Sequence, residues 1–433
     1  MIQSLIDFLS SSPVNFLAVK TICEALDKKG FHYIDARDQI DTLKPGDKVY
    51  FTKNDSSIYA FHIGRQTMQD AGFHIICAHC DSPTFRVKPQ PEMMRGGMLS
   101  LNTEVYGGAI LSTWFDRPLS LAGRVILRNK EDIMRPEPRL LHIKRPLLTI
   151  PNLAIHFNRQ VNDGVKLSKQ KDMIPLMAVV TDEMKNEKWS LKKLIADELG
   201  SITEDDILDY DLYLYDTTPA CTFGLNQEFI SAGRLDDLSM VHAALSAMLN
   251  TADETPDVTS VMAIFDNEEM GSQTKQGAGS PFLSAILHRM ISVNVSVNVT
   301  DAYYQTVEKA FMISADNAHA WHPNYNDKYD PTNHPLLGGG PVIKLNAAQK
   351  YATDAMSAAI FQEICRKAGV PCQRFVNHSD VAGGSTLGNI LAGSLPLRGV
   401  DMGNGVLAMH SCRETASCRD HEYCIKAFSE FYS

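Results

Sequence analysis

Several apolar segments of the sequence end in residues that could bind a metal ion. The segment AIFDNEEMGS, residues 263–272, begins as an apolar run and then places Asp266, Glu268 and Glu269 close together. Neighbouring carboxylates repel one another and resist losing water, so a cation is expected beside them. Three more apolar runs end similarly: HIICAHCD at His79 and Asp81, FMISADNAH at Asp316, and GVLAMHS at His410.

These side chains offer imidazole nitrogen and carboxylate oxygen, a donor set that suits Zn²⁺, Mn²⁺ or Co²⁺. Each has a simpler explanation when taken singly. A histidine at a strand end is often only hydrogen-bonded, and Asp236 or Asp237 in GRLDD could cap the helix that follows. Taken together, several strand ends that carry histidine and carboxylate indicate a shared cation site.

Buried strands and one long helix are expected to position these residues. Continuous apolar runs are typical of strands buried on both faces, and ligands of open α/β sheets bind beyond the carboxyl ends of the strands. The segment DDLSMVHAALSAMLN, residues 236–250, predicts a helix with one apolar face. The first 30 residues also have helical spacing of apolar residues.

A change in the local sequence pattern along the chain predicts two domains. From KPQPEMMRGGML onward, short strand-like pieces alternate with proline-rich connections, and after Asp237 helices alternate with β-rich runs. We therefore expect an α/β domain with a central, mostly parallel sheet flanked by helices, formed by residues 1–89 and 233–433. Residues 90–232 are expected to form an inserted β-rich domain.

Composition excludes some classes of function. The formal net charge of −10 gives no overall basic field for nucleic acid or an anionic membrane. No apolar run is long enough to span a membrane, and the start of the chain lacks the features of a signal peptide. Nine scattered cysteines are expected to be mostly reduced. A cytoplasmic protein is the expectation, and a zinc site at Cys77 and Cys80 is not favoured.

An ordered set of motifs carries a family resemblance over nearly the whole chain. The motifs are AHCDSP, GRLDDL, FDNEEMGS, SADNAHAWHPNY, GPVIKLNAAQKYATD and LAMHSCRE, between residues 78 and 414. In this order they resemble the aspartyl aminopeptidases, which are metal-dependent exopeptidases. The resemblance implies an aminopeptidase that removes N-terminal Asp or Glu with two divalent ions, Zn²⁺ or alternatively Mn²⁺ or Co²⁺.

The resemblance also assigns roles to residues of the site. Asp236 would bridge the two ions, with His79 and Asp316 completing one ion and Glu269 and His410 the other. Glu268 would be the general base, and Asp81 would orient His79. Asp266 is expected to have a structural role in the turn.

Further residues are linked to substrate and assembly. His156 resembles a histidine that reaches the active site of a neighbouring subunit, although it could simply be a half-buried strand residue. The resemblance implies a homo-oligomer, a tetrahedral dodecamer in which the inserted domain makes the dimer contact. Lys344 is the candidate cation for an acidic substrate side chain, with snorkelling to the surface as its alternative. His319 is a candidate for substrate binding; His319 or His322 could instead belong to a rigid loop.

Two departures from the family pattern bear on specificity. Ala382, Gly383 and Gly384 stand where Pro-Cys-Gly is expected, which puts the shape of the substrate pocket in question. Asp237 stands where asparagine is common, which could change the surroundings of the bridging carboxylate but not the bridge.

Three other functions remain open from the sequence. An aminopeptidase of broader specificity is the nearest alternative, and an amidohydrolase or deacylase on a similar scaffold is a second. A catalytically inactive relative that acts as an oligomeric binding protein is the third. Such a relative is expected to lose ligands or the base, whereas every expected position is filled here.

Overall fold

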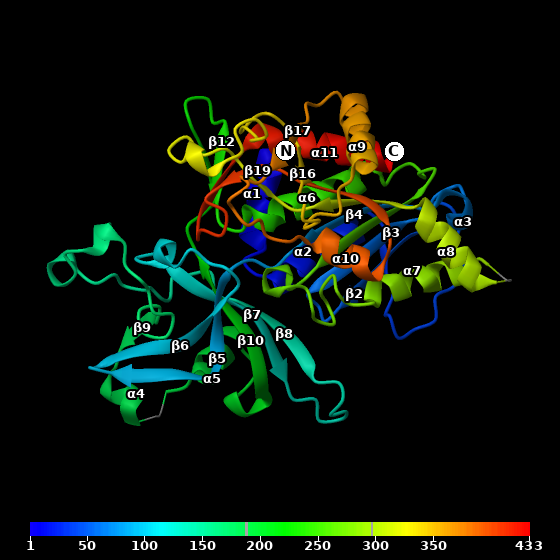
Figure 1. Ribbon diagram of the computed structural model, residues 1–433. Coiled ribbons are helices and arrows are strands. Elements are labelled where there is room, and N and C mark those ends of the chain that lie inside the picture. The colour runs from blue at the N-terminus through cyan, green and yellow to red at the C-terminus, as the bar shows by residue number, and fades with distance from the viewer. Residues whose placement is uncertain (187–188, 296–297) are drawn as a thin grey trace. The chain divides into compact units, whose positions relative to one another are not determined.

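The computed structural model describes residues 1–186, 189–295 and 298–433. Within them the chain forms two compact units, traced in Figure 1. The first unit comprises Met1–Asp81, Ala220–Met409 and Glu414–Ser433. The second unit comprises Ser82–Pro219 and the short segment His410–Arg413.

A nine-stranded, mostly parallel sheet is the framework of the first unit. The strand order is β1 (His32–Tyr33), β2 (Lys48–Lys53), β3 (Ser57–His62), β13 (Thr259–Phe265), β4 (Phe73–His79), β14 (Phe311–Ala315), β18 (Arg398–Gly403), β16 (Val342–Leu345), β17 (Gln373–Val376). The central strands β13, β4, β14 and β18 pair in parallel. β13 and β14 are buried along their whole length, as continuous apolar runs predict.

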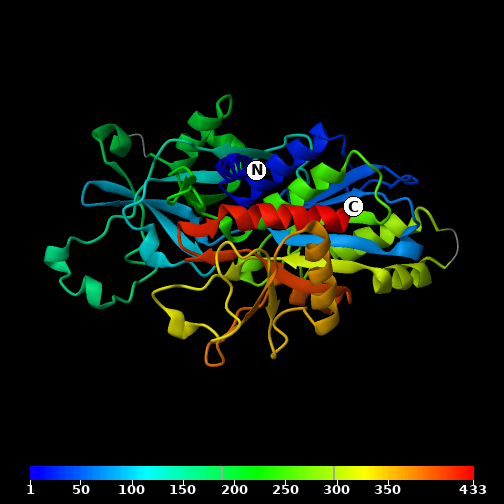
Figure 2. The ribbon, with the colours of Figure 1, turned by 90° about the horizontal axis from the view of Figure 1, so that it is seen from above.

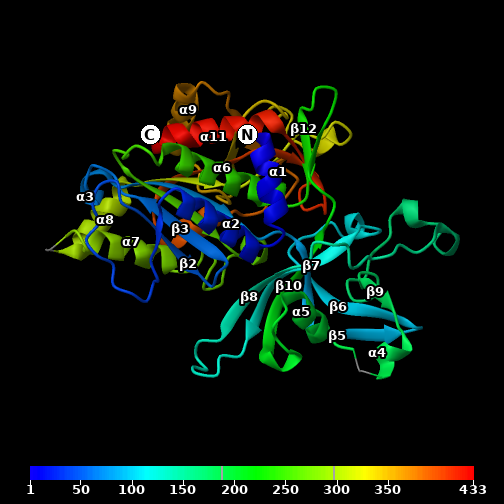
Figure 3. The same ribbon diagram turned by 180° about the vertical axis from the view of Figure 1, so that it is seen from behind.

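Helices cover both faces of this sheet, so the predicted α/β architecture is confirmed. One face packs against α1 (Ile2–Ser11), α2 (Asn15–Lys28), α6 (Leu235–Thr251), α9 (Ala355–Ala368) and α11 (Cys418–Tyr432). The opposite face packs against α3 (Met68–Ala71), α7 (Phe282–Ser292), α8 (Val299–Lys309) and α10 (Leu387–Ser394). Figure 2 shows α11 in red, and Figure 3 shows α1, α2 and α6 beside one another.

The predicted helices near residues 1–30 and 236–250 are present. The first region forms α1 and α2, which bury Leu5 and Phe8 in α1 and Phe16 and Val19 in α2. The prediction that α6 has a single apolar face is wrong, because this helix is buried on nearly all sides over its first three turns. The small residues Ala243, Ala244 and Ala247 fit such an environment, which a one-faced pattern does not reveal.

A second, five-stranded sheet also belongs to the first unit. Its order is β11 (Cys221–Phe223), β12 (Phe229–Ala232), β20 (Glu414–Ser417), β19 (Gly405–Leu407), β15 (Ala318–His319). The run GVLAMHS was expected to be a strand of the main sheet, but its strand β19 pairs with β15 and β20 instead. Asn404 separates β18 from β19, so the chain leaves one sheet for the other at this residue.

The second unit is built on a six-stranded antiparallel sheet. The order is β8 (Glu137–His142), β7 (Leu119–Leu127), β10 (Ile207–Asp216), β5 (Thr84–Arg95), β6 (Met98–Tyr106), β9 (Leu176–Val179). Its core includes Leu191 and Ile195 of α5 (Leu191–Leu199), and α4 (Asp182–Asn186) lies on the surface. Its main segment overlaps the inserted domain expected at 90–232. Over the described residues of both units, no helix is long and apolar enough to cross a membrane.

Candidate metal centre

Three neighbouring parallel strands end at the candidate site. Phe265, the last residue of β13, pairs with His79, the last residue of β4. β14 lies on the other side of β4, and Asp316 follows it directly. The turn after β13 carries Glu268 and Glu269 in a short 3₁₀ helix, Glu268–Met270. The carboxyl ends of these strands therefore bring histidine and carboxylates to one edge of the sheet.

The ligand atoms of these residues lie close together. His79, Asp236, Asp237 and Asp316 offer atoms within 4.8 Å of one another, and all four side chains are buried. A second group with the same spacing joins His79 to Glu268 and Glu269. The structure thus brings together four of the five predicted metal ligands and the predicted base within the first unit.

Asp81 contacts both His79 and the paired glutamates. Its Oδ1 lies 3.3 Å from Nδ1 of His79, as expected for a carboxylate that orients a ligating imidazole. Its two carboxylate oxygens also accept hydrogen bonds from the backbone N–H groups of Glu268, at 3.0 Å, and Glu269, at 3.1 Å. Asp81 therefore fixes the turn that carries the proposed base, which the sequence did not indicate.

Two residues that the sequence analysis missed hold the start of α6. Glu414 accepts a hydrogen bond from the backbone N–H of Asp236 at 3.0 Å. Asn317 donates to the Leu235 carbonyl at 2.8 Å and contacts Asp237 at 3.3 Å. Both lie inside the quoted motifs SADNAHAWHPNY and LAMHSCRE, but only the folded chain shows that their partner is the start of α6.

Asp266 and Asp237 have structural contacts. Asp266 is buried and accepts hydrogen bonds from Asn15 of α2, at 2.9 Å, and from the Asn267 backbone, at 2.8 Å. The Oδ2 atom of Asp237 accepts a hydrogen bond from the backbone N–H of His79 at 3.2 Å. These contacts fit the structural part expected for Asp266 and show what the unusual Asp237 touches.

Keeping the clustered carboxylates ionised costs free energy, because they are buried and repel one another. Desolvation, together with repulsion from Asp316 and Glu269, raises the pKa of Glu268 to about 8, although His79 opposes the shift. Desolvation is also the first cause of the raised pKa values of Asp237 and Asp316. Burial alone would lower the pKa of His79, but Asp236 and Asp81 raise it well above its usual value. Positive charge is therefore favoured here.

The residues present fit a zinc-type ion. Nε2 of His79 lies 3.6 Å from Oδ1 of Asp236, which is longer than a hydrogen bond. Two ligands that are each about 2 Å from a tetrahedral ion lie roughly 3.3 Å apart. Imidazole and carboxylate donors in a buried, acidic cluster suit Zn²⁺, and Mn²⁺ and Co²⁺ use the same donor types.

Lys344 is buried and contacts a candidate ligand. Its Nζ lies 3.3 Å from Oδ1 of Asp316 and donates to the Asn317 carbonyl at 3.2 Å. The ammonium group also lies 5.4 Å from the centre of the Tyr351 ring. The alternative that Lys344 snorkels to the surface is wrong, because the side chain is only 3% exposed.

His410 and His156 belong to the second unit. His410 follows β19, has a positive φ of 68°, and places Nδ1 3.2 Å from the Gly108 carbonyl of the same unit. His156 lies in a short 3₁₀ helix, Ile155–Phe157, and is exposed. The alternative of a half-buried strand histidine is therefore wrong, since no strand forms at His156.

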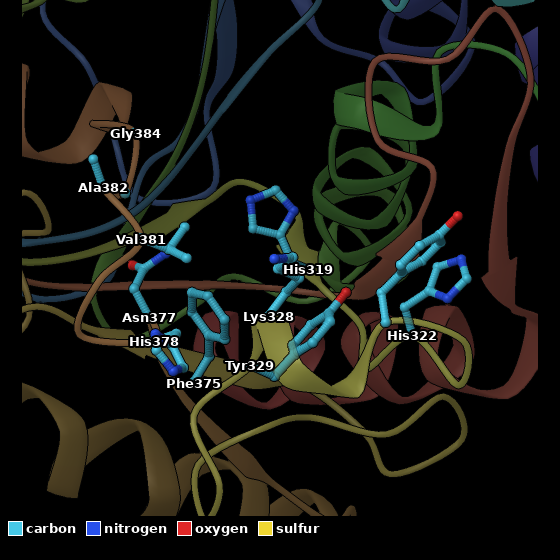
Figure 4. Close-up of a pocket in the computed structure, with 12 residues that line it drawn as sticks. His319, His322, Lys328, Tyr329, Phe375, Asn377, His378, Val381, Ala382 and Gly384 are labelled. Carbon is cyan, nitrogen blue, oxygen red and sulfur yellow. The ribbon is translucent and has the colours of Figure 1, made fainter. Parts of the chain in front are cut away.

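A cavity of about 350 Å³ has His319, three residues after Asp316 in the chain, among its lining residues. Figure 4 shows its lining residues. His319 at the end of β15 lines it together with His322 from the following loop, and Phe375 of β17 packs on His319 with ring centres 6.0 Å apart. The remaining lining residues are Tyr325, Lys328, Tyr329, Asn377, His378, Val381, Ala382, Gly383 and Gly384.

The departure from the family pattern at residues 382–384 lies on the wall of this cavity. A Cβ atom at Gly383 would approach the Oδ1 atom of Asn377 to 2.6 Å, closer than such contacts allow. Glycine at this position therefore leaves room for Asn377 beside the cavity. A larger residue would require Asn377 to move.

Comparisons with known proteins agree with one another. The family model described as aminopeptidase I zinc metalloprotease (M18) matches residues 8–432. A probable M18 family aminopeptidase 2 of Clostridium acetobutylicum is 49% identical over 100% of this chain and 98% of its own.

Two solved structures are similar over nearly the whole chain. A chain in the structure of the Ape4 and Nbr1 complex has a TM-score of 0.94 and 36% identity, covering 99% of this chain and 85% of that chain. The mApe1 dodecamer of S. cerevesiae has a TM-score of 0.85 and 26% identity, covering 99% and 95%.

Proposed function

The chain belongs to the M18 family of zinc metalloproteases, which are aminopeptidases, and we propose that it removes Asp and Glu from the N-termini of peptides. The observation that carries the acidic preference is the lining of the cavity that includes His319. Three histidines and Lys328 line it, and no aspartate or glutamate is among the lining residues. A negative side chain would meet hydrogen-bond donors there.

We propose two divalent ions, with Zn²⁺ as the first candidate. His79 and Asp316 would hold one, Glu269 and His410 the other, and Asp236 would bridge them. The two groups of candidate ligands that include His79 support this assignment. His410 is joined through Met409 to the first unit and precedes by four residues Glu414, which hydrogen-bonds Asp236.

Glu268 acts as the general base in this proposal. When bound, the two ions would acidify the attacking water and polarise the scissile carbonyl. The Glu268 carboxylate takes a proton from the water and passes it to the leaving amine. Asp81 holds Glu268 through its backbone N–H and keeps the imidazole of His79 oriented.

Lys344 remains our candidate for a cation that faces the acidic side chain. It is buried, and its strand β16 pairs with β17, where Lys344 is in register with the cavity residue Phe375. Its contact with Asp316 gives it a second possible role, in positioning that ligand. The two roles predict different substrate dependence when Lys344 is replaced.

We further propose that the enzyme is a homo-oligomer, a tetrahedral dodecamer in which the second unit makes the dimer contact and His156 reaches a neighbour's site. The similar S. cerevesiae protein is named a dodecamer. Exposed apolar side chains flank His156, with Ile155 51% and Phe157 81% exposed. Such a surface fits a contact between protein subunits. The nine free cysteines fit a cytoplasmic setting.

The test of the function is the release of free amino acid from peptides that begin with Asp, Glu, Ala or Leu. The proposal expects Asp and Glu to be released roughly ten- to a hundredfold faster in kcat/KM. A chelator is expected to abolish all release, and Zn²⁺ to restore it. Faster release of Leu would instead support an aminopeptidase of broader specificity.

A further inference from the structure

We propose that Asp401 is a positioning residue for substrate recognition, because its carboxylate joins the wall of the cavity to the segment beside Lys344. This inference rests on the proposed function, in which that cavity takes the substrate side chain. Asp401 lies in β18, and its side chain is buried. It belongs to none of the groups of candidate metal ligands among the described residues. A buried carboxylate outside the metal cluster needs hydrogen-bond donors from the protein.

One oxygen of this carboxylate holds the start of α10. Oδ1 of Asp401 accepts a hydrogen bond from the hydroxyl of Thr386 at 2.8 Å. Thr386 directly precedes α10, where a threonine side chain usually accepts a hydrogen bond from the helix backbone. Its side chain makes no such capping bond here. The hydroxyl of Thr386 therefore joins α10 to β18 instead of capping the helix.

The first turn of α10 also approaches the sheet closely, at Gly388. A Cβ atom at this position would lie 2.5 Å from Oγ of Ser314 and 2.8 Å from Oδ1 of Asp401, closer than such contacts allow. Ser314 of β14 is the register partner of Asp401 in the parallel pair of β14 and β18. Glycine at residue 388 thus lets α10 begin directly against Asp401.

The residues just before Thr386 form one wall of the cavity. Ala382, Gly383 and Gly384 line it (Figure 4). Gly384 stands only two residues before Thr386 in the chain. Two residues span at most about 7 Å, so the hydrogen bond at Thr386 limits how far this wall can move.

The other oxygen of the carboxylate holds the segment beside Lys344. Oδ2 of Asp401 accepts a hydrogen bond from the backbone N–H of Ala352 at 2.5 Å, and the Asp401 backbone N–H donates to Oγ1 of Thr353 at 2.8 Å. Ala352 directly follows Tyr351, whose ring centre lies 5.4 Å from Nζ of Lys344. One buried carboxylate therefore holds the backbone next to the cavity wall and the backbone next to Tyr351.

The experiment replaces Thr386 in the full-length metal-loaded enzyme and measures kcat and KM on Asp- and Ala-initiated peptides. Thr386→Val removes the donor to Asp401. Losing one hydrogen bond should raise KM for the Asp-initiated peptide roughly three- to tenfold, with kcat and metal content unchanged. The rise should be smaller for the Ala-initiated peptide, because its side chain is shorter and uncharged. Thr386→Ser keeps the hydroxyl and should restore the wild-type KM.

Hydrogen–deuterium exchange of the same variants tests the connection through Asp401 without any substrate. In Thr386→Val, backbone amides should exchange faster at residues 381–388 and also at residues 351–353, because both segments are held by the same carboxylate. Thr386→Ser should exchange as the wild type does in both segments.

The wild type separates this inference from the proposed function. A wild type that does not prefer the Asp-initiated peptide contradicts the acidic preference. The role of Asp401 is then still decided by exchange in the two segments and by KM for the peptide that the wild type prefers.

Thr306→Val is the matched control, because the buried Thr306 hydroxyl donates to the Ala302 carbonyl within α8, at 2.7 Å. It should change neither KM nor exchange in the two segments. The proposal is overturned if Thr386→Val matches Thr386→Ser in KM, if kcat falls while KM is unchanged, or if faster exchange stays confined to residues 381–388. Should Thr386→Val fail to fold, Asp401→Asn makes the same comparison, because an amide offers one acceptor oxygen where a carboxylate offers two.

Discussion

The position of Glu268 depends on a residue far away in the sequence. Asp81 accepts hydrogen bonds from the backbone N–H groups of both Glu268 and Glu269, so these two glutamates are held through their backbone. The Glu268 side chain is 13% exposed, and its carboxylate lies 4.0 Å from Nε2 of His79. A substitution that keeps the size of Glu268 should therefore leave this arrangement intact.

We predict that Glu268→Gln lowers kcat by roughly 10²–10⁴-fold, because the amide cannot accept the proton of the attacking water. The metal content, measured by elemental analysis, should stay equal to that of the wild type. Glu269→Gln is the matched control and should lose metal instead. Ordinary turnover by Glu268→Gln would assign the base to another residue.

We predict that Lys344→Met lowers kcat/KM for Asp- and Glu-initiated peptides roughly ten- to a hundredfold more than for Ala- and Leu-initiated ones. A hydrogen bond to a charged group contributes about 1.5–3 kcal/mol, which corresponds to this range. Equal losses on all four peptides, together with lost metal, would show that Lys344 only positions Asp316. Lys309→Met changes an exposed lysine and should alter neither property.

The predictions made from single residue types were limited by contacts that arise only on folding. The polar ends of the apolar runs were enough to place His79, Glu269 and Asp316 together, and the start of the predicted helix added Asp236. The sequence could not show that Asn317 and Glu414 hold the start of α6, because both contacts join segments far apart in the chain. The partner of Lys344 was hidden for the same reason.

At the scale of elements, α6 links the metal centre to the helical layer. Asp236 is its second residue, and its His242 hydrogen-bonds both Ser4 of α1 and His421 of α11, each at 2.9 Å. The ring of Phe8 also packs on His242, with ring centres 5.5 Å apart. His242 lies in the helix predicted at residues 236–250, but the sequence gave no sign of a second buried histidine as its partner.

This histidine pair predicts a loss of stability in acid. Burial lowers the pKa of His242 from 6.5 to about 4 and lowers that of His421 well below its usual value. The unfolded chain therefore binds more protons than the folded one below pH 6.5. The stability that the neutral histidine pair contributes to the folded state is fully present above pH 6.5 and is lost as the pH falls towards about 4. Below about pH 4 the loss from His242 levels off.

For His242 alone, we expect about 2 kcal/mol less free energy of unfolding at pH 5 than at pH 7. Urea unfolding at the two pH values measures it, and His242→Leu should show a smaller decrease than the wild type. His32→Gln changes an exposed histidine and serves as the control. The same decrease in His242→Leu and wild type would contradict the prediction.

Elements that change sheets are hard to predict from local patterns. The run GVLAMHS reads as apolar, yet its strand β19 and the preceding strand β18 belong to different sheets on either side of Asn404. Both strands satisfy the same local preference for buried extended backbone, so the local pattern does not show which partner each selects. The partner of each strand is determined by contacts with segments far away in the sequence.

At the scale of the whole molecule, the main question is whether one subunit completes the site of another. The exposed apolar residues beside His156 are expected to be covered in an assembly. We predict that light scattering gives a mass several times 48.0 kDa, and twelve times that value for the proposed dodecamer. An active species with the mass of one chain would contradict the assembly and the shared site together.

A mixing experiment tests the shared site directly. His156→Ala and Glu268→Gln are each expected to be nearly inactive as pure proteins. If His156 acts in the site of a neighbour, a mixed assembly contains sites that combine Glu268 from one subunit with His156 from another.

Random mixing of equal amounts should make about a quarter of the sites complete, because each of the two requirements is met half of the time. Activity should therefore rise on co-expression of the two variants. Native mass spectrometry must first show that the two chains share assemblies; mixed assemblies that stay as inactive as the pure variants would place His156 outside the neighbour's site.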